Sequence, residues 1–342
     1  MAQLSKGLLF NPKGDDSLLA RELLGGSSTN IFNLNNVKYS WAIKLYKTML
    51  ENFWIPEKIS LVEDNIDDLT EEERRAFKGS LGFLTFLDSI QTNNISNIAD
   101  YITAPEVKLA LAVHQFQEAI HSQSYAYIFE STVPSFEERE SIYNFWREDK
   151  ILLERNSYIA GIYQDFLTNQ TEENYFRVIV ANYILEGLYF YNGFSFFYNL
   201  ASRKKMIGTS QEIKLINRDE LTHIVLFQHI LKEIKPKIAN ADSIIISMFK
   251  EAVKQELTWS NHILKNILGV SESSTENYTK HLANRRLKNI GLAPLFENVS
   301  NPYKHLEKIA DVQAQATVKG NFFETSVTTY NMSSALSGWD EI

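Results

Sequence analysis

The sequence predicts one all-α domain, and three observations support this class. Seven prolines and fourteen glycines are few for 342 residues, which disfavours a turn-rich β protein. The prolines leave uninterrupted runs at 57–104, 135–235 and 237–293, and proline mostly marks where helices end. Hydrophobic residues make up 44% of the chain, enough for a large core. We therefore expect a bundle of long helices.

The expected elements follow in order along the chain. Residues 1–36 show no helical pattern and are expected to be irregular, whereas residues 37–310 are expected to form the helical domain. The acids that follow Asp68 suit a helix N-terminus, as does Pro105, and the polar segment at Thr209 suggests another start. The expected helices span residues 37–52, 69–96, 105–130, 136–167, 172–204, 210–234, 241–268 and 275–291.

Residues 311–342 are rich in Ser, Thr, Asn and Ala and are expected to form a flexible tail. Aromatic residues such as Tyr330 and Trp339, followed by terminal acids, suit a segment that binds a partner. Fraying at the end of a chain explains the same composition equally well.

Composition disfavours several partners and chemistries. The net charge of −8 offers no general attraction for a phosphate backbone, so a nucleic-acid partner is not expected. The first residues contain no apolar stretch of signal-peptide length, and we expect a cytoplasmic protein. The absence of cysteine excludes disulfides, thiolate zinc sites, iron–sulfur clusters and cysteine-dependent catalysis within this chain.

The most informative pattern is the absence of charge from four long stretches. Asp88 is the only charged residue between Lys78 and Asp100, and each of the other stretches likewise has a lone carboxylate or a close pair. An isolated buried carboxylate is costly unless it is neutralised, hydrogen-bonded or bound to a cation. One common explanation is therefore preferable to four separate ones. The carboxylates of the other three stretches are Glu118, Glu186 and the pair Asp219–Glu220.

Two of these carboxylates are followed by a histidine one helical turn later. Glu118 precedes His121 and Glu220 precedes His223, so each pair shares a helix face. One such pair is most simply a hydrogen-bonded core histidine, but two pairs with two further central carboxylates match the dinuclear site of four-helix bundles. Oxygen-rich ligands with one imidazole per metal suit iron or manganese. The expected ligands are Asp88, Glu118, His121, Glu186, Glu220 and His223.

Tyr125 follows His121 by four residues, so both lie on the same helix face. A tyrosine in this position is most often part of the core. Beside an oxidising metal pair it would instead donate an electron and pass its proton to a neighbour such as Asp88. Apolar residues spaced at helical intervals from the ligands would exclude water, although ordinary core packing also explains them. These residues are Phe190, Phe194, Ile213 and Ile216.

The run 178–202 contains 25 residues and one charge, which is long enough to span a membrane. Polar residues such as Asn182, Asn192 and Asn199 are spread through it, however. A buried bundle helix is therefore expected, and no membrane association.

The motifs resemble those of the small (β), radical-generating subunit of class I ribonucleotide reductase. The resemblance covers roughly residues 30 to 342 and depends on the order and spacing of all motifs together. The matching segments are Phe53-Trp54-Ile55-Pro56-Glu57, Asp88-Ser89-Ile90-Gln91, Glu118-Ala-Ile-His121-Ser-Gln-Ser-Tyr125, Glu186-Gly-Leu-Tyr-Phe190 and Arg218-Asp219-Glu220-Leu-Thr-His223.

This resemblance implies a ferritin-like bundle, a homodimer, and two metal ions per chain held by the six expected ligands. Iron is the first candidate, and manganese, activated with a flavoprotein, is the alternative. Tyr125 would hold a stable radical, and Trp54, hydrogen-bonded through Asp219 to His121, would begin the electron path out of the site. Tyr330 would relay the radical to a large subunit, which the tail through Ile342 would bind. That large subunit would supply the cysteines that reduce ribonucleotides to deoxyribonucleotides.

Particular residues distinguish this chain within the family. His114 stands one turn before Glu118, where some members have an aromatic residue, so the surrounding hydrogen bonds are expected to differ. Tyr125 disfavours the subgroup with phenylalanine and a manganese–iron pair, and the four carboxylates disfavour the metal-free subgroup. The amino-terminal segment is too short for the nucleotide-binding cone that some relatives add, so allosteric control is expected to reside in the large subunit. An oxygen-dependent desaturase or hydroxylase on the same bundle, and a metal-storing or structural bundle, remain the alternatives.

Overall fold

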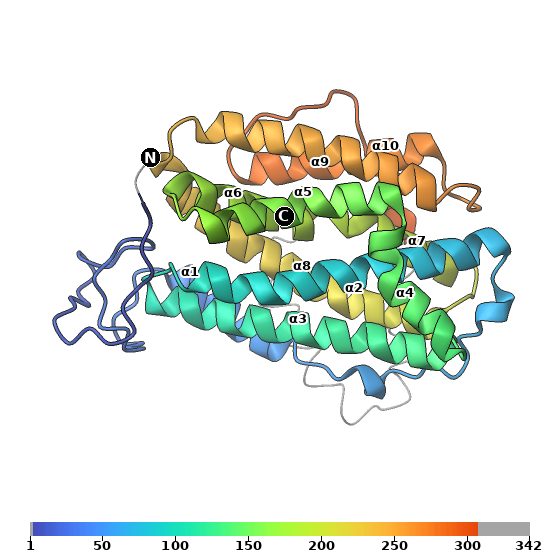
Figure 1. The fold of residues 1–342 in the computed structure, drawn as a ribbon, viewed down its shortest axis with the longest axis horizontal. Helices are drawn as coiled ribbons and strands as arrows, with labels where there is room; N and C mark the ends of the chain where they lie inside the picture. Colours follow the sequence, from blue (N-terminus) through green and yellow to red (C-terminus); the bar gives the residue numbers. More distant parts are fainter. Residues whose placement is uncertain (1–2, 307–342) are drawn as a thin grey trace.

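The computed structural model describes residues 3–306, and this part of the chain is all-α, as predicted (Figure 1). Residues 3–36 contain no helix. Helices then follow one another to residue 289, with one π-helical turn at Leu185–Tyr189, here named the π-turn. The α-helices are α1 (Ser40–Glu51), α2 (Glu71–Ala99), α3 (Pro105–Thr132), α4 (Phe136–Glu148), α5 (Lys150–Thr168), α6 (Glu172–Ile184), α7 (Tyr191–Ser202), α8 (Ile207–Ile234), α9 (Ala241–Ile263) and α10 (Glu272–Asn289).

Four elements form the centre of the bundle: α2, α3, α8 and the α6–π-turn–α7 segment. In Figure 1, α9 and α10 lie at the top and α2 and α3 lie in the lower half, with α5, α6 and α8 between them. The charge-poor run at 178–202 is buried in the α6–α7 segment almost throughout, as predicted for a bundle helix. Within residues 3–306, no helix is both long and apolar enough to cross a membrane.

Local signals explain two helix starts, and a distant residue explains a third. Thr70 and Glu73 form a reciprocal capping box at α2, and Pro105 occupies the first turn of α3, where its missing N–H costs nothing. The start predicted at residue 210 was wrong, because α8 begins at Ile207. Its first amides donate to the carboxylate of Asp64, at 2.9 Å from the nitrogen of Gly208. The cap therefore comes from a residue far away in sequence.

Two helices that were predicted to be continuous are interrupted. The segment 136–167 contains α4 and α5, separated at Asp149, whose side chain accepts the amide of Leu152 and caps α5. The segment 172–204 is broken by the π-turn, which contains Glu186. Neither interruption has a proline, and hydrophobic periodicity does not register a single wide turn. Residues 307–342, including the expected tail and Tyr330, lie outside the described part of the chain.

Candidate metal centre

The structure brings the six residues expected as ligands into one buried cluster at the centre of the bundle. Each has a side chain that is 0% exposed. The three-residue spacing in α3 and α8 directs a carboxylate and an imidazole from each helix toward the same point. The six are Asp88 from α2, Glu118 and His121 from α3, Glu186 from the π-turn, and Glu220 and His223 from α8.

The potential ligand atoms form two groups, and within each group they lie within 4.8 Å of one another. Glu118 belongs to both groups and can therefore bridge two cations. We name the groups the Asp88 position and the Glu186 position. The Asp88 position contains Asp88, Glu118, His121 and Glu220, and the Glu186 position contains His114, Glu118, Glu186 and His223.

The unpaired atoms of this cluster fit two bound cations. Both oxygens of Asp88 and of Glu220, and Oε2 of Glu186, are buried without a hydrogen-bond partner in the described structure. Nδ1 of His121 lies 3.2 Å from Oε1 of Glu220, and Nδ1 of His223 lies 3.4 Å from its Oε2, so both imidazoles face the carboxylates. Unpaired buried carboxylates are costly, and a hard cation relieves that cost. The oxygen-rich donor set suits iron or manganese.

The outward nitrogens of the two histidines have partners that fix the rings. Nε2 of His223 lies 3.0 Å from Oε1 of Gln117, and Nε2 of His121 lies 3.4 Å from Oδ2 of Asp219. The indole nitrogen of Trp54 donates to the same Asp219 oxygen at 2.8 Å. Such partners set ring orientation and ligand basicity in metal sites. Trp54, Asp219 and His121 therefore form a continuous polar path from the centre toward α1.

Two donors converge on one oxygen of Glu186. Gln91 donates to Oε1, and Nε2 of His114 lies 2.8 Å from the same atom, whereas Oε2 has no partner. The hydroxyl of Tyr163 donates to the amide oxygen of Gln91 at 3.1 Å and orients it. This arrangement leaves Oε2 available to a cation. Sequence reasoning missed Gln91 and Gln117 as partners and did not count His114 among the potential ligands. Amides inside the charge-free runs were a signal, but each run contains several of them.

Proton affinities in the centre are strongly shifted. Burial would raise the pKa of Glu118, but hydrogen bonds from His114, His121 and His223 outweigh burial and hold it well below its usual range. Burial would lower the pKa of His223, yet interactions with the nearby carboxylates of Glu118 and Glu220 raise it to about 10. For Asp88, burial and then the charge of Glu118 raise the pKa well above the usual value. Cation binding must therefore displace protons from this cluster.

Tyr125 lies on α3 with its ring fully buried. Its hydroxyl makes no hydrogen bond of normal geometry in the described structure. Asp88 is its polar neighbour: burial, then the charge of Asp88 and a hydrogen-bonding interaction with it, raise the pKa of Tyr125 well above its usual value. The phenol is therefore kept protonated and apart from solvent.

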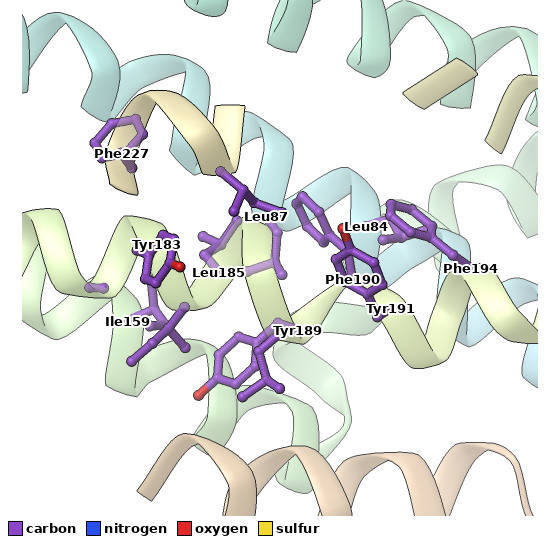
Figure 2. Close-up of a cluster of buried hydrophobic side chains, with 14 of the residues drawn as sticks. Leu84, Leu87, Ile159, Tyr183, Leu185, Tyr189, Phe190, Tyr191, Phe194 and Phe227 are labelled. Carbon is purple, nitrogen blue, oxygen red and sulfur yellow. The ribbon is translucent and has the colours of Figure 1, made fainter. Parts of the chain in front are cut away.

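The apolar residues expected around the ligands are all in the core, with exposed fractions of at most 1%. Figure 2 shows Phe190, Phe194 and Leu84 close together beside the π-turn segment. Ile213 and Ile216 lie on α8 before Glu220. These residues make the surroundings of the π-turn and of α8 dry.

A ferritin-like bundle with two carboxylate–histidine positions defines the class of dinuclear carboxylate proteins. A family model described as "Ribonucleotide reductase, small chain" matches residues 31–302. The ribonucleoside-diphosphate reductase subunit beta of Treponema pallidum is 40% identical over 341 residues, which cover 97% of each chain. The protein of that name from Halalkalibacterium halodurans is 36% identical over the whole of both chains. The ribonucleotide reductase R2 subunit from Clostridium botulinum is 45% identical, with a TM-score of 0.86, covering 90% of this chain and 99% of that one.

The chain belongs to the ribonucleotide reductase small-chain family. It is thus an oxidoreductase subunit that works with a large subunit. This result confirms the resemblance drawn from the sequence motifs, and it does not favour the desaturase or hydroxylase alternative.

Proposed function

We propose that the buried centre binds two metal ions and uses oxygen to oxidise Tyr125 to a stable radical. Iron is the first candidate and manganese, with a flavoprotein activator, the alternative. The observation that carries the proposal is the Tyr125 hydroxyl, which is fully buried and interacts with Asp88, one of the expected metal ligands. A phenol in this setting can lose an electron without meeting water or external reductants.

The residues in and around the centre each have a defined role in this proposal. When bound, the metal pair supplies the oxidising power through oxygen activation. The carboxylates of Asp88, Glu186 and Glu220, with Glu118 between the two positions, balance the cation charge. On oxidation, Tyr125 releases its phenolic proton from Oη, and Asp88 is the carboxylate that can accept it. Phe190, Phe194, Ile213 and Ile216 exclude water.

Trp54, Asp219 and His121 are proposed to carry the electron between the centre and the protein surface. The 2.8 Å hydrogen bond from Trp54 to Asp219 and the 3.4 Å separation of Asp219 from His121 support this path. Tyr330, in the tail 311–342, is proposed to relay the radical to the large subunit, which the last residues bind. The helical domain 37–310 is proposed to form a homodimer, and the substrates are ribonucleoside diphosphates, as the names of the relatives indicate.

The test is an electron paramagnetic resonance spectrum recorded after loading iron(II) and admitting air. A tyrosyl signal is expected in the wild type and should be lost in Tyr125→Phe. If iron gives no signal, the same experiment with manganese(II) and a reduced flavoprotein tests the alternative metal. Absence of a tyrosyl signal under both conditions, with two metal ions bound, would overturn the proposal.

A further inference from the structure

Two buried arginines contact the backbone of the π-turn that carries Glu186. Arg286 on α10 donates from Nε to the carbonyl oxygen of Gly187 at 3.0 Å. Arg155 on α5 donates from Nη2 to the carbonyl oxygen of Tyr189 at 3.1 Å. Both side chains are only 1% exposed, which is rare for arginine because a guanidinium loses its hydration on burial. Neither arginine lies on a ligand-bearing element, so both approach the π-turn from outside the centre.

The guanidinium of Arg155 is fixed from several directions. Its Cζ lies 4.1 Å from the ring centroid of Phe83 and 3.9 Å from that of Tyr189. It also forms a buried ion pair with Glu256 on α9. Stacking on two rings and pairing with a carboxylate leave the planar group little freedom. The carbonyl of Tyr189 therefore meets a donor in a defined place.

Arg286 reaches the π-turn at a residue without a side chain. A Cβ at position 187 would lie 3.2 Å from Nε and 3.3 Å from Cδ of Arg286, which is too close without a shift of the arginine. The hydroxyl of Tyr183 on α6 donates to the backbone carbonyl of Arg286 at 2.9 Å. Gly187 thus permits the close approach, and Tyr183 ties α10 to the helix that leads into the π-turn.

A π-turn needs such support. Its wider hydrogen-bonding pattern is rare, and its junctions with α-helix change the pairing of backbone groups. We propose that Arg286 and Arg155 are positioning residues that fix the π-turn and thereby direct Oε2 of Glu186 toward the Glu186 position. This inference rests on the proposed binding of two metal ions. Glu186 is the only one of the expected ligands on the π-turn, so the Asp88 position should not depend on the two arginines.

The experiment titrates the metal-free full-length protein with manganese(II) alone and follows free ion by electron paramagnetic resonance. Arg286→Met should weaken binding at the Glu186 position by about 10-fold or more, as loss of groups supporting metal ligands typically does. Binding at the Asp88 position should keep its wild-type affinity. Hydrogen–deuterium exchange of amides 185–190 should become faster. Arg286→Lys, which restores a donor, should recover part of both properties. Gly187→Ala, which displaces the arginine only slightly, should weaken binding at the Glu186 position less than Arg286→Met does.

Two control variants separate the outcomes. Arg21→Met removes another buried arginine, paired with Glu106 at 3.2 Å, and should not alter the ratio of the two affinities. Glu186→Ala should abolish binding at the Glu186 position alone. If Glu186→Ala does so while Arg286→Met leaves the affinity ratio and the exchange rates unchanged, the arginine inference is overturned. If the wild type binds no ion that depends on Glu186, the proposed function itself has failed.

Discussion

Replacing Tyr125 with phenylalanine is expected to stabilise the metal-free protein while it removes the radical. The hydroxyl is fully buried and makes no hydrogen bond of normal geometry in the described structure, with Asp88 as its polar neighbour. Burying a hydroxyl without a partner costs about 1–3 kcal/mol. Because phenylalanine keeps the ring, Tyr125→Phe should raise the free energy of unfolding by about the same 1–3 kcal/mol.

Tyr175 provides a matched control for this substitution. It is also fully buried, but its hydroxyl donates to the backbone carbonyl of Ile98 at 3.0 Å. Tyr175→Phe should therefore lower the free energy of unfolding by about 1 kcal/mol, because a formed hydrogen bond is lost, although the carbonyl keeps the amide of Tyr101 as a donor. Opposite signs for two chemically identical substitutions would show that hydrogen bonding, and not ring packing, decides the outcome.

The assay is urea unfolding of the metal-free proteins, followed by circular dichroism at equal protein concentration, since self-association would make stability concentration-dependent. A loss of 1 kcal/mol or more in Tyr125→Phe would refute the reasoning, as the hydroxyl would then have a partner, with Asp88 the first candidate. A gain would indicate that the tyrosine is retained at a cost in stability, as expected of a functional group.

Two further predictions concern α8 and the tail. Glu212 is buried, is hydrogen-bonded to Ser124, and burial raises its pKa from 4.5 to about 8, so the folded state binds the extra proton between these values. The free energy of unfolding should therefore fall as pH rises from 4.5 to 8, by at most about 1.4 kcal/mol per pH unit. Glu212→Gln should flatten this pH dependence when it is measured by urea unfolding. A variant with the same pH dependence as the wild type would contradict the prediction. Tyr330→Phe should keep the Tyr125 radical signal but abolish deoxyribonucleotide formation with the large subunit; normal turnover would remove Tyr330 from the path.

The sequence alone determined the helical class and six of the seven potential ligands of the centre, all but His114. Charge-free runs, each interrupted by a carboxylate, and two Glu-x-x-His pairs are local patterns that a helix converts directly into shared faces. Because these carboxylates lie on separate helices and are costly to bury alone, one common site was the simplest explanation for all of them. For Asp88, Glu118, Glu186 and Glu220, burial and helix spacing were therefore sufficient to predict which residues meet.

The tertiary structure decided how those residues are oriented. Asp64 caps α8, and Gln91 and His114 both contact Oε1 of Glu186. These contacts join residues that are distant in sequence, and hydrophobic periodicity does not encode them. The π-turn is likewise supported by arginines from α5 and α10. One wide turn rotates the side chains that follow it by about 100° relative to a regular helix. The free energy that this turn costs is offset by contacts that form only in the folded core.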